Sequence, residues 1–358
     1  MIGRETKMEQ TINPITTRII ASAMAFAAVT MQAQPTNSAT PPKPIVAGKE
    51  YTHPIRYEIW APKEVKKSTN EVFRVWIPEQ VKQVRAVIVV PDYSTDRAIY
   101  FSEELGYRQF AEKMDFALMA YRVFNEDSDK TRDEATREML SVLESVAKKS
   151  GHPELAHASL LPTGLSWGGR CAMAIALSVP ERTLGFFPLH CTLTFKEVTE
   201  SAHKEAFFKV PGLCETVEFE QYYDKKRPPF EATDTGLAVR ACNALGALQA
   251  SYIFPGSRHN DVKNHAFIWQ WITCITNKRL PSPLTFDKVP ELKPTPRESG
   301  WIGTYDCEHQ WDAEKKVEHF QVKSVTITPF ADFKGDPATA NWLPDETLAK
   351  AWKAKMGF

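Results

Sequence analysis

The sequence of 358 residues lacks the short motifs that define several classes of enzyme. It contains neither Gly-x-x-x-x-Gly-Lys nor Gly-x-Gly-x-x-Gly, the loops that hold the phosphates of nucleotides and dinucleotides. It contains no His-Glu-x-x-His, and five of its histidines lack the spacing of metal ligands: His152, His157, His190, His203 and His319. We therefore expect no bound metal and no cofactor.

Neither sign of charge is in excess. Lys and Arg together number 44, as do Asp and Glu, so the formal net charge is zero. Nucleic-acid-binding domains usually carry a clear basic excess, so we expect no nucleic-acid partner.

The apolar run at residues 19–29 falls well short of the ~20 residues that span a bilayer, and no other segment could span one.

Closely spaced cysteines are also absent. The six cysteines are far apart and form no Cys-x-x-Cys, which excludes a small disulfide-held scaffold and a zinc ribbon. Disulfides are permitted if the chain leaves the cytosol, but the sequence assigns no pairs.

The N-terminus has the pattern of a secretory signal peptide. Arg4, Lys7 and Arg18 precede the apolar run, and small or polar residues follow it. We interpret residues 1–33 as the signal peptide and residues 34–50, rich in Pro, Thr and Ser, as a linker. The expected localisation is secreted or periplasmic, with no stable membrane insertion after cleavage. An uncleaved anchor is the alternative.

From residue 86 to residue 275, strand patterns alternate with helix patterns. Residues 86–90 and 116–121 are continuous apolar runs, as expected of strands that are covered on both faces. This alternation predicts an α/β fold in which a mostly parallel, twisted sheet carries helices on both faces. The other expected strands are 55–60, 71–77, 184–191, 211–220 and 250–254, and the expected helices are 101–114, 130–149, 196–208, 236–248 and 264–275.

The composition changes after residue 280, where prolines mark an extended connector. Residues 300–305 and 322–327 predict a small β-element, and residues 341–352 end as a short helix. We therefore divide the chain into a main domain, residues 51–280, and a C-terminal extension, residues 281–358, that packs on it.

The motif that bears most directly on function is Gly164-Leu165-Ser166-Trp167-Gly168. An apolar strand pattern precedes it and a helix pattern follows it, which is the context of a nucleophile elbow. Glycine at both flanking positions removes collisions with the neighbouring backbone, and the helix directs its first N–H groups at the serine. Ser166 is therefore the candidate nucleophile.

With this motif and this order of strands and helices, residues 51–280 resemble the α/β-hydrolase superfamily. More narrowly, the chain looks like secreted bacterial esterases related to the polyhydroxybutyrate-depolymerase and feruloyl-esterase groups. The resemblance implies a catalytic triad in the chain order Ser, Asp or Glu, then His. It points to His259 as the general base, because Gly256-Ser257-Arg258-His259 matches the Gly-x-x-His of the loop before the final helix. His265 is the alternative base.

The same resemblance implies a carboxylate after the strand that begins near residue 211. Glu220 is the expected acid and Glu218 the alternative, although the Gly-x-x-Asp ending of relatives is missing. The oxyanion hole needs two N–H groups. Trp167 would supply one and Tyr93 the other, in a loop where relatives usually carry His-Gly or Gly-Gly.

These residues predict a secreted serine hydrolase that cleaves carboxylic esters through an acyl-enzyme intermediate, with a Ser-His-Glu triad. Its substrate would be a small-molecule or polymer-linked ester. Two alternatives remain open at this point: a peptidase or amidase of the same fold, and a catalytically inactive hydrolase-like module that binds a surface or polymer.

We expect the exported protein to begin close to Gln34, because the small and polar residues that suit cleavage end there. N-terminal sequencing of exported material tests this expectation. Recovery of Met1 or Met8 from that material would show that the apolar segment is not removed.

Overall fold

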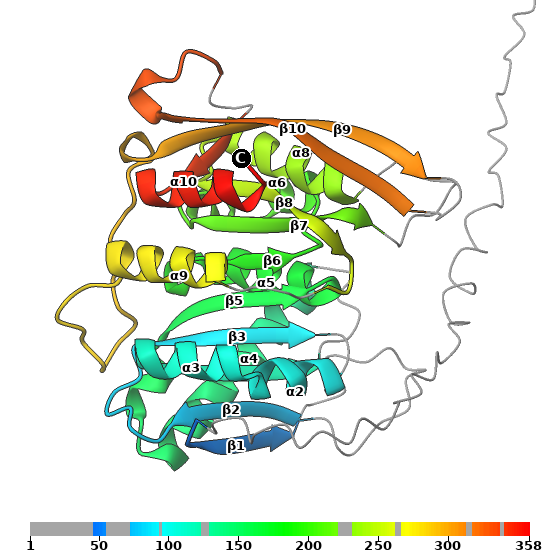
Figure 1. Ribbon diagram of the computed structural model, residues 1–358. Coiled ribbons are helices and arrows are strands. Elements are labelled where there is room, and N and C mark those ends of the chain that lie inside the picture. Colours follow the sequence, from blue (N-terminus) through cyan, green and yellow to red (C-terminus); the bar gives the residue numbers. More distant parts are fainter. Residues whose placement is uncertain are drawn as a thin grey trace, which may run out of the picture. The chain divides into compact units, whose positions relative to one another are not determined.

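A mixed eleven-stranded sheet forms the centre of the part of the chain that the computed structural model describes (Figure 1). The described residues are 46–54, 72–92, 95–122, 129–220, 231–261, 266–312, 317–336 and 340–358, all within the unit Ile45–Phe358. The expected signal peptide, most of the linker and the expected strand at 55–60 lie outside these residues.

The strands run in the order β1-β2-β4-β3-β5-β6-β7-β10-β9-β11, and β8 also pairs with β7. Pairing is antiparallel between β1 and β2 and between β2 and β4, and parallel from β4 through β3, β5, β6 and β7 to β8. The bounds are β1 (Gly48–Pro54), β2 (Val72–Pro78), β3 (Ala86–Asp92), β4 (Phe116–Arg122), β5 (Ser159–Leu165), β6 (Phe187–Leu189), β7 (Gly212–Glu220), β8 (Gln249–Arg258), β9 (Trp301–Asp312), β10 (Val317–Pro329) and β11 (Asn341–Leu343).

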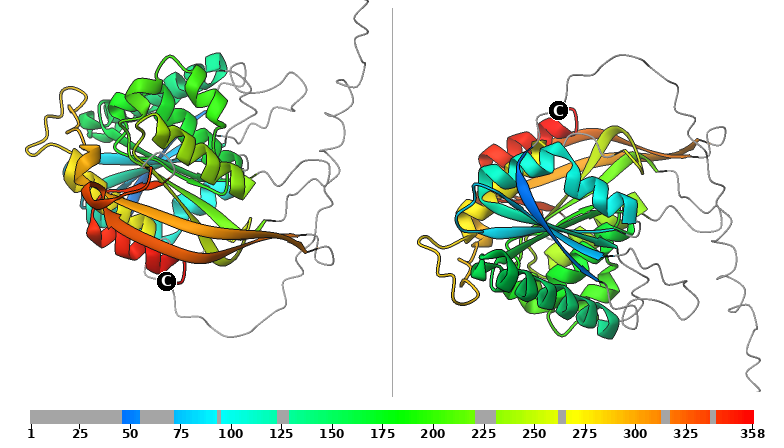
Figure 2. Two further views of the ribbon diagram at one scale, coloured as in Figure 1. Left: turned by 90° about the horizontal axis from the view of Figure 1, so that it is seen from above. Right: turned by 90° about the horizontal axis from the view of Figure 1, so that it is seen from below.

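Helices cover both faces of this sheet (Figure 2). One face carries α2, α3, α9 and α10, and the other carries α4, α5 and α8, with α6 and α7 beside them. The bounds are α2 (Thr95–Glu103), α3 (Leu105–Met114), α4 (Asp129–Ser150), α5 (Trp167–Ser178), α6 (Phe195–Glu200), α7 (Lys204–Phe207), α8 (Glu231–Ala244), α9 (Ala266–Arg279) and α10 (Glu346–Lys355). The predicted α/β architecture is confirmed: a mixed sheet whose strands from β4 to β8 are parallel carries helices on both faces.

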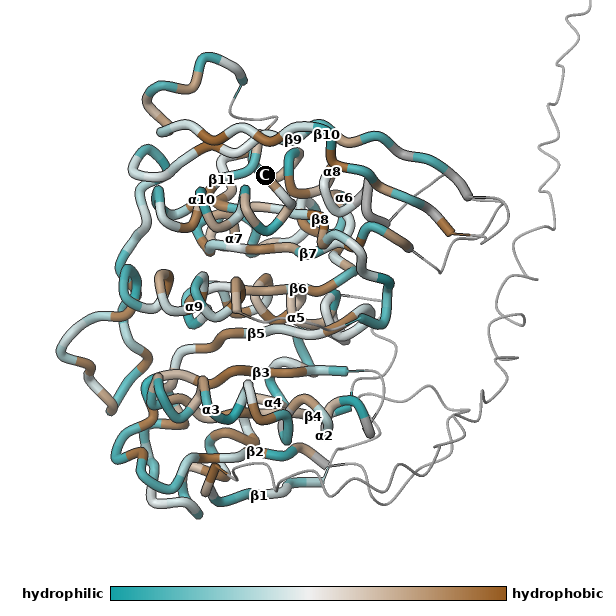
Figure 3. The backbone as a smooth tube through the Cα atoms, viewed as in Figure 1, coloured by the Kyte–Doolittle hydropathy of each residue, from teal (hydrophilic) through white to brown (hydrophobic). Residues whose placement is uncertain are grey.

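The two faces bury alternate side chains of the same strand. In β3, Ile88 and Val90 belong to the apolar cluster that includes residues of α3 and α9, whereas Val87 and Val89 belong to the cluster that includes residues of α4 and α5. Successive side chains of a strand point to opposite faces, so a strand covered on both sides must be apolar throughout. Figure 3 shows the result as hydrophobic colouring along β3, one of the two strands that read as continuous apolar runs in the sequence.

Two predicted helices are each divided in two, and residues 196–208 form the separate helices α6 and α7. Residues 101–114 were expected to form a single helix, but α2 ends at Glu103 and α3 begins at Leu105. Glu104 between them has extended backbone, and its carboxylate accepts a hydrogen bond from the N–H of Tyr107 at 3.0 Å. The side chain thus caps α3, and a cap residue lies outside the helix that it stabilises.

The C-terminal extension shares the core of the main domain. The β9–β10 hairpin pairs with the end of β7 through residues 318 and 319, and β11 pairs with β9. In α10, Trp352 is fully buried, and its indole N–H donates to the carbonyl of Ser251 in β8 at 2.9 Å. The side-chain oxygen of Asn341 accepts from the backbone N–H of the same serine at 2.6 Å.

All six cysteines lie in the described ranges, and none forms a disulfide. Cys171, Cys214 and Cys242 are buried among apolar side chains, where they act as small hydrophobic residues. Among the described helices, none combines the length and the apolar character needed to cross a membrane.

Trp352→Ala should lower the free energy of unfolding by about 3–5 kcal/mol, because it removes a fully buried indole that joins the extension to β8. Phe358→Ala is the control, since that ring is 46% exposed at the C-terminus. It should change the free energy by less than about 0.5 kcal/mol. Chemical denaturation measures both. Equal small effects would show that the extension does not stabilise the main domain.

Candidate active site

Ser166 lies at the turn between β5 and α5, at the carboxyl edge of the sheet. Its backbone has φ 55° and ψ −122°, a conformation that L-residues rarely adopt. Such strain costs on the order of 1–3 kcal/mol and persists only where the surroundings impose it. Here the Ser166 N–H donates to the carbonyl of Leu189 in β6 at 2.8 Å, and the serine carbonyl accepts from Arg170 in the first turn of α5.

Close backbone contacts explain the glycines around the serine. A Cβ added at Gly164 would lie 2.5 Å from the carbonyl oxygen of Gly168, and one at Gly168 would lie 2.2 Å from that of Pro91. A Cβ at Gly169 would lie within 2.9 Å of three carbonyl oxygens. The predicted collisions are therefore present, and the backbone at the end of β3 is one of the surfaces that cause them.

The loop after β8 brings a histidine to the serine. The Nε2 atom of His259 lies 2.8 Å from the Oγ atom of Ser166, although the two residues are 93 positions apart. His259 is 4% exposed. It sits in a turn in which the Arg258 N–H donates to the Asp261 carboxylate and the Asp261 N–H donates to the Arg258 carbonyl. A serine and an imidazole at this distance can exchange a proton.

The N-terminus of α5 points its first N–H groups toward Ser166. Trp167 is the first residue of the helix, and the first four N–H groups of a helix have no carbonyl partner within it. The guanidinium of Arg170 lies over the Trp167 ring, 5.3 Å from its centroid, and forms an ion pair with Glu197. These contacts hold the side chain that follows the nucleophile. Tyr93 lies outside the described residues.

The two candidate acids lie at the end of β7. Glu218 is engaged elsewhere: its carboxylate accepts from the N–H of Gly256 at 2.6 Å and contacts Nε2 of His319 at 2.6 Å. Glu220 is the last residue of β7, and nothing is described of its side chain. In the pairing of β7 with β8, Phe219 lies opposite Arg258, so the end of β7 is level with the start of the His259 turn.

The Glu218 contact has a specific structural cause. Between the pairs Val217–Phe254 and Phe219–Arg258, β7 advances two residues while β8 advances four. The bulge thus lies in β8, where Gly256 has φ 69°. The Glu218 carboxylate accepts a hydrogen bond from the N–H that this bulge would otherwise leave without a strand partner.

His265, the alternative base, lies outside the described residues.

Two buried polar residues at this edge of the sheet were not among the predicted site residues. Asp92, the last residue of β3, is fully buried, and its Cα lies 3.2 Å from where a Cβ on Gly168 would be. His190 follows β6, and its Nδ1 lies 2.6 Å from the carbonyl oxygen of His259. The only signal for them in the sequence is that each is a polar residue at the end of an apolar strand. Residues of ordinary loops occur at the same position, so this signal does not identify a site.

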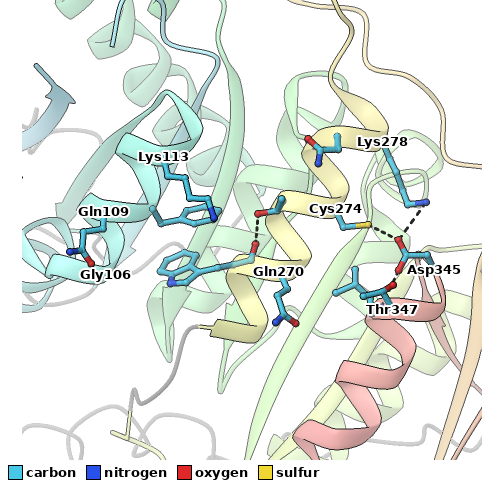
Figure 4. Close-up of a pocket in the computed structure, with 13 residues that line it drawn as sticks. Gly106, Gln109, Lys113, Gln270, Cys274, Lys278, Asp345 and Thr347 are labelled. Carbon is cyan, nitrogen blue, oxygen red and sulfur yellow. Dashed lines mark hydrogen bonds and ion pairs between the residues drawn. The ribbon is translucent and has the colours of Figure 1, made fainter. Parts of the chain in front are cut away.

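A cavity of about 740 Å³ lies between α3, α9 and α10, away from this constellation (Figure 4). None of the residues that line it is a predicted site residue. In it the Cys274 thiol donates to Asp345 at 3.0 Å, and Lys278 lies 3.6 Å from the same carboxylate. Burial, together with Asp345, raises the pKa of Cys274 to about 12, so this thiol is a hydrogen-bond donor and not a nucleophile at neutral pH.

Within the described ranges, no three or more His, Cys, Asp or Glu residues form a group that could hold a metal ion. A strained serine, an imidazole in contact with its hydroxyl and a helix N-terminus meet at one place. These are the parts that acyl transfer to a serine requires.

No model of a protein family matches the sequence, and no curated protein matches it. Among solved structures, the chain is similar to FphF, a fluorophosphonate-binding serine hydrolase of Staphylococcus aureus, at 12% identity over 64% of this chain and 97% of that one, with a TM-score of 0.43. It is similar to the S-formylglutathione hydrolase of the same organism at 13% identity over 65% and 97%, with a TM-score of 0.41. A feruloyl esterase module of Clostridium thermocellum matches at 11% identity over 60% and 82%, with a TM-score of 0.40.

Proposed function

We propose that this protein is a serine hydrolase that cleaves carboxylic esters through an acyl-enzyme intermediate. The observation that carries the proposal is the 2.8 Å contact between His259 Nε2 and Ser166 Oγ at a strained elbow. A serine hydroxyl is a weak nucleophile unless a base removes its proton. The proposal therefore rests on the contacts of this chain and not on the distant structural neighbours.

In the acylation step, His259 Nε2 accepts the proton of Ser166 as Oγ bonds to the acyl carbon of the ester. The carbonyl electron pair moves to oxygen, and the Trp167 N–H donates to the resulting oxyanion. Tyr93 is proposed as the second donor. When the ester C–O bond breaks, the leaving alcohol takes the proton from His259.

In the deacylation step, His259 removes a proton from water as the water oxygen bonds to the acyl carbon. Collapse of this second tetrahedral species breaks the bond to Ser166, whose Oγ recovers the proton, and the carboxylic acid leaves. The contact of His259 with Ser166 supports the proton transfers between these two residues, because no solvent molecule needs to relay the proton.

Glu220 is proposed as the carboxylate that orients His259 through Nδ1 and offsets the charge that the ring gains. Two observations support it over Glu218. The end of β7 is level with the His259 turn, and the Glu218 carboxylate already accepts from Gly256 and contacts His319.

The proposed setting is secreted or periplasmic, with residues 1–33 removed and a small-molecule or polymer-linked ester as substrate. The sequence pattern at the N-terminus supports export. The chemistry of the Ser166–His259 pair supports an ester as substrate.

The wild-type protein should react covalently with a fluorophosphonate and hydrolyse short-chain p-nitrophenyl esters. Ser166→Ala should abolish both, because it removes the attacking oxygen, while the melting temperature stays nearly unchanged. Mass spectrometry of the labelled protein and a turnover assay measure the two effects. Full ester turnover by Ser166→Ala would end the proposal. Labelling combined with turnover of aminoacyl anilides in place of esters would make the protein an amidase.

Glu220→Gln should lower kcat by on the order of 10⁴, because a neutral amide leaves the imidazole in the wrong tautomer. Glu218→Gln is the matched control on the same strand and should be only mildly impaired. Steady-state kinetics with the same ester compares them. The reverse ranking would transfer the role to Glu218, and two mild effects would place the acid elsewhere.

A further inference from the structure

A second histidine lies beneath the proposed general base. His190 follows β6 and is 2% exposed. Its Nδ1 lies 2.6 Å from the carbonyl oxygen of His259, and its Nε2 lies 2.9 Å from the Oε1 atom of Glu215 in β7. The other oxygen of that carboxylate, Oε2, accepts a hydrogen bond from the hydroxyl of Tyr252 in β8. The three side chains thus form a buried chain of hydrogen bonds that ends on the backbone of His259.

Hydrogen-bond chemistry fixes the direction of the last link. A carbonyl oxygen can only accept, so Nδ1 of His190 carries a proton and donates it to His259. The Nε2–Glu215 contact then holds one shared proton, either on an imidazolium or on a carboxylic acid. Burial and the Glu215 charge raise the pKa of Tyr252 well above its usual value, so its hydroxyl remains a donor. Every contact in the chain is therefore satisfied.

The backbone at His190 is held in an uncommon conformation. Its φ is 62°, which a non-glycine residue adopts only when the surroundings require it. The His190 N–H also donates to the carbonyl of Glu215 at 2.8 Å. The strain directs the imidazole across the ends of β6 and β7 to the His259 turn.

We propose that His190, supported by Glu215 and Tyr252, is a positioning residue. It holds the backbone of the base loop so that His259 Nε2 remains within reach of Ser166. This inference rests on the proposed function, because it assigns His190 a role in keeping that pair aligned. The loop needs such a restraint, since it follows a bulge in β8 and the strand ladder does not extend to His259.

Two substitutions at one position separate the donor from the rest of the side chain. In asparagine the amide nitrogen is bonded to Cγ, as Nδ1 is in histidine, and asparagine tolerates positive φ. His190→Asn therefore keeps a donor for the His259 carbonyl. His190→Gly takes the same φ without strain but has no donor. Both variants remove the contact with Glu215. They therefore differ only in the donor to the His259 carbonyl, which is the proposed restraint.

With a p-nitrophenyl ester, His190→Gly should lower kcat about 10- to 100-fold, because small displacements of a catalytic group are costly. His190→Asn should stay within about fivefold of wild type. KM should change less than about twofold in both, since no contact with substrate is removed. Equal kcat values for the two variants, whether both normal or both low, would overturn the proposal.

A second pair of variants covers the case in which His190→Gly does not fold. Glu215→Gln can donate to Nε2 of a neutral His190 and accept from Tyr252, so kcat should remain near that of wild type. Glu215→Leu can do neither and leaves the buried Nε2 of His190 without a partner, so the ring is no longer held toward the His259 carbonyl and kcat should fall about tenfold or more. Loss of activity in Glu215→Gln equal to that in Glu215→Leu would show that the charge of Glu215 is required and would refute a positioning role.

His152→Asn is the remote control. His152 also contacts a buried carboxylate, Glu154, at 2.9 Å, but it precedes β5 at the opposite edge of the sheet. It should leave kcat unchanged. Failure of the proposed function can be distinguished from failure of the positioning role. If the proposed function is wrong, the wild-type protein itself shows neither fluorophosphonate labelling nor ester turnover.

Discussion

The contact on which the rest of this structure depends is the close approach of backbone to backbone at the elbow. The N-terminus of α5 lies so near the ends of β3 and β5 that no side chain fits at Gly164 or Gly168. This approach forces the serine between them into its strained conformation and places it above the sheet edge. Any residue with a Cβ at either position would separate the helix from the strands, and the serine would lose its place.

The other groups reach the serine because parallel strands end at one edge. Ser166 follows β5, His190 follows β6 and His259 follows β8, so residues far apart in the chain meet without a long loop. The C-terminal extension contributes to the same edge. Its His319 stacks on Phe219, with ring centroids 4.8 Å apart, and contacts Glu218, which in turn holds the bulge that leads to His259. The extension is thus continuous with the framework of the base loop.

Features that depend on a short stretch of sequence could be predicted. The apolar runs of β3 and β4 reflect strands that are covered on both faces, and the glycines around Ser166 reflect close backbone contacts, so these residues predicted the fold and the elbow. Features that depend on the register between strands could not be predicted. The sequence pattern alone does not distinguish Glu218 from Glu220, because the bulge lies in the partner strand β8, and only the pairing of the two strands shows that Glu218 is used there. The break at Glu104 arises because this residue caps α3 instead of continuing α2, and helical periodicity in the sequence does not distinguish the two roles.

The helix that follows the nucleophile is apolar on nearly every side. Its residues contribute to the core beneath α4 through Cys171 and Ile175 and to the core beside α8 through Met173 and Leu177. Segments buried in this way do not open by local fraying, so their amide hydrogens exchange with solvent only when the whole domain unfolds. We therefore expect the strain at Ser166 to be borne by a slowly exchanging part of the protein, so that the geometry of the elbow persists for as long as the domain itself remains folded.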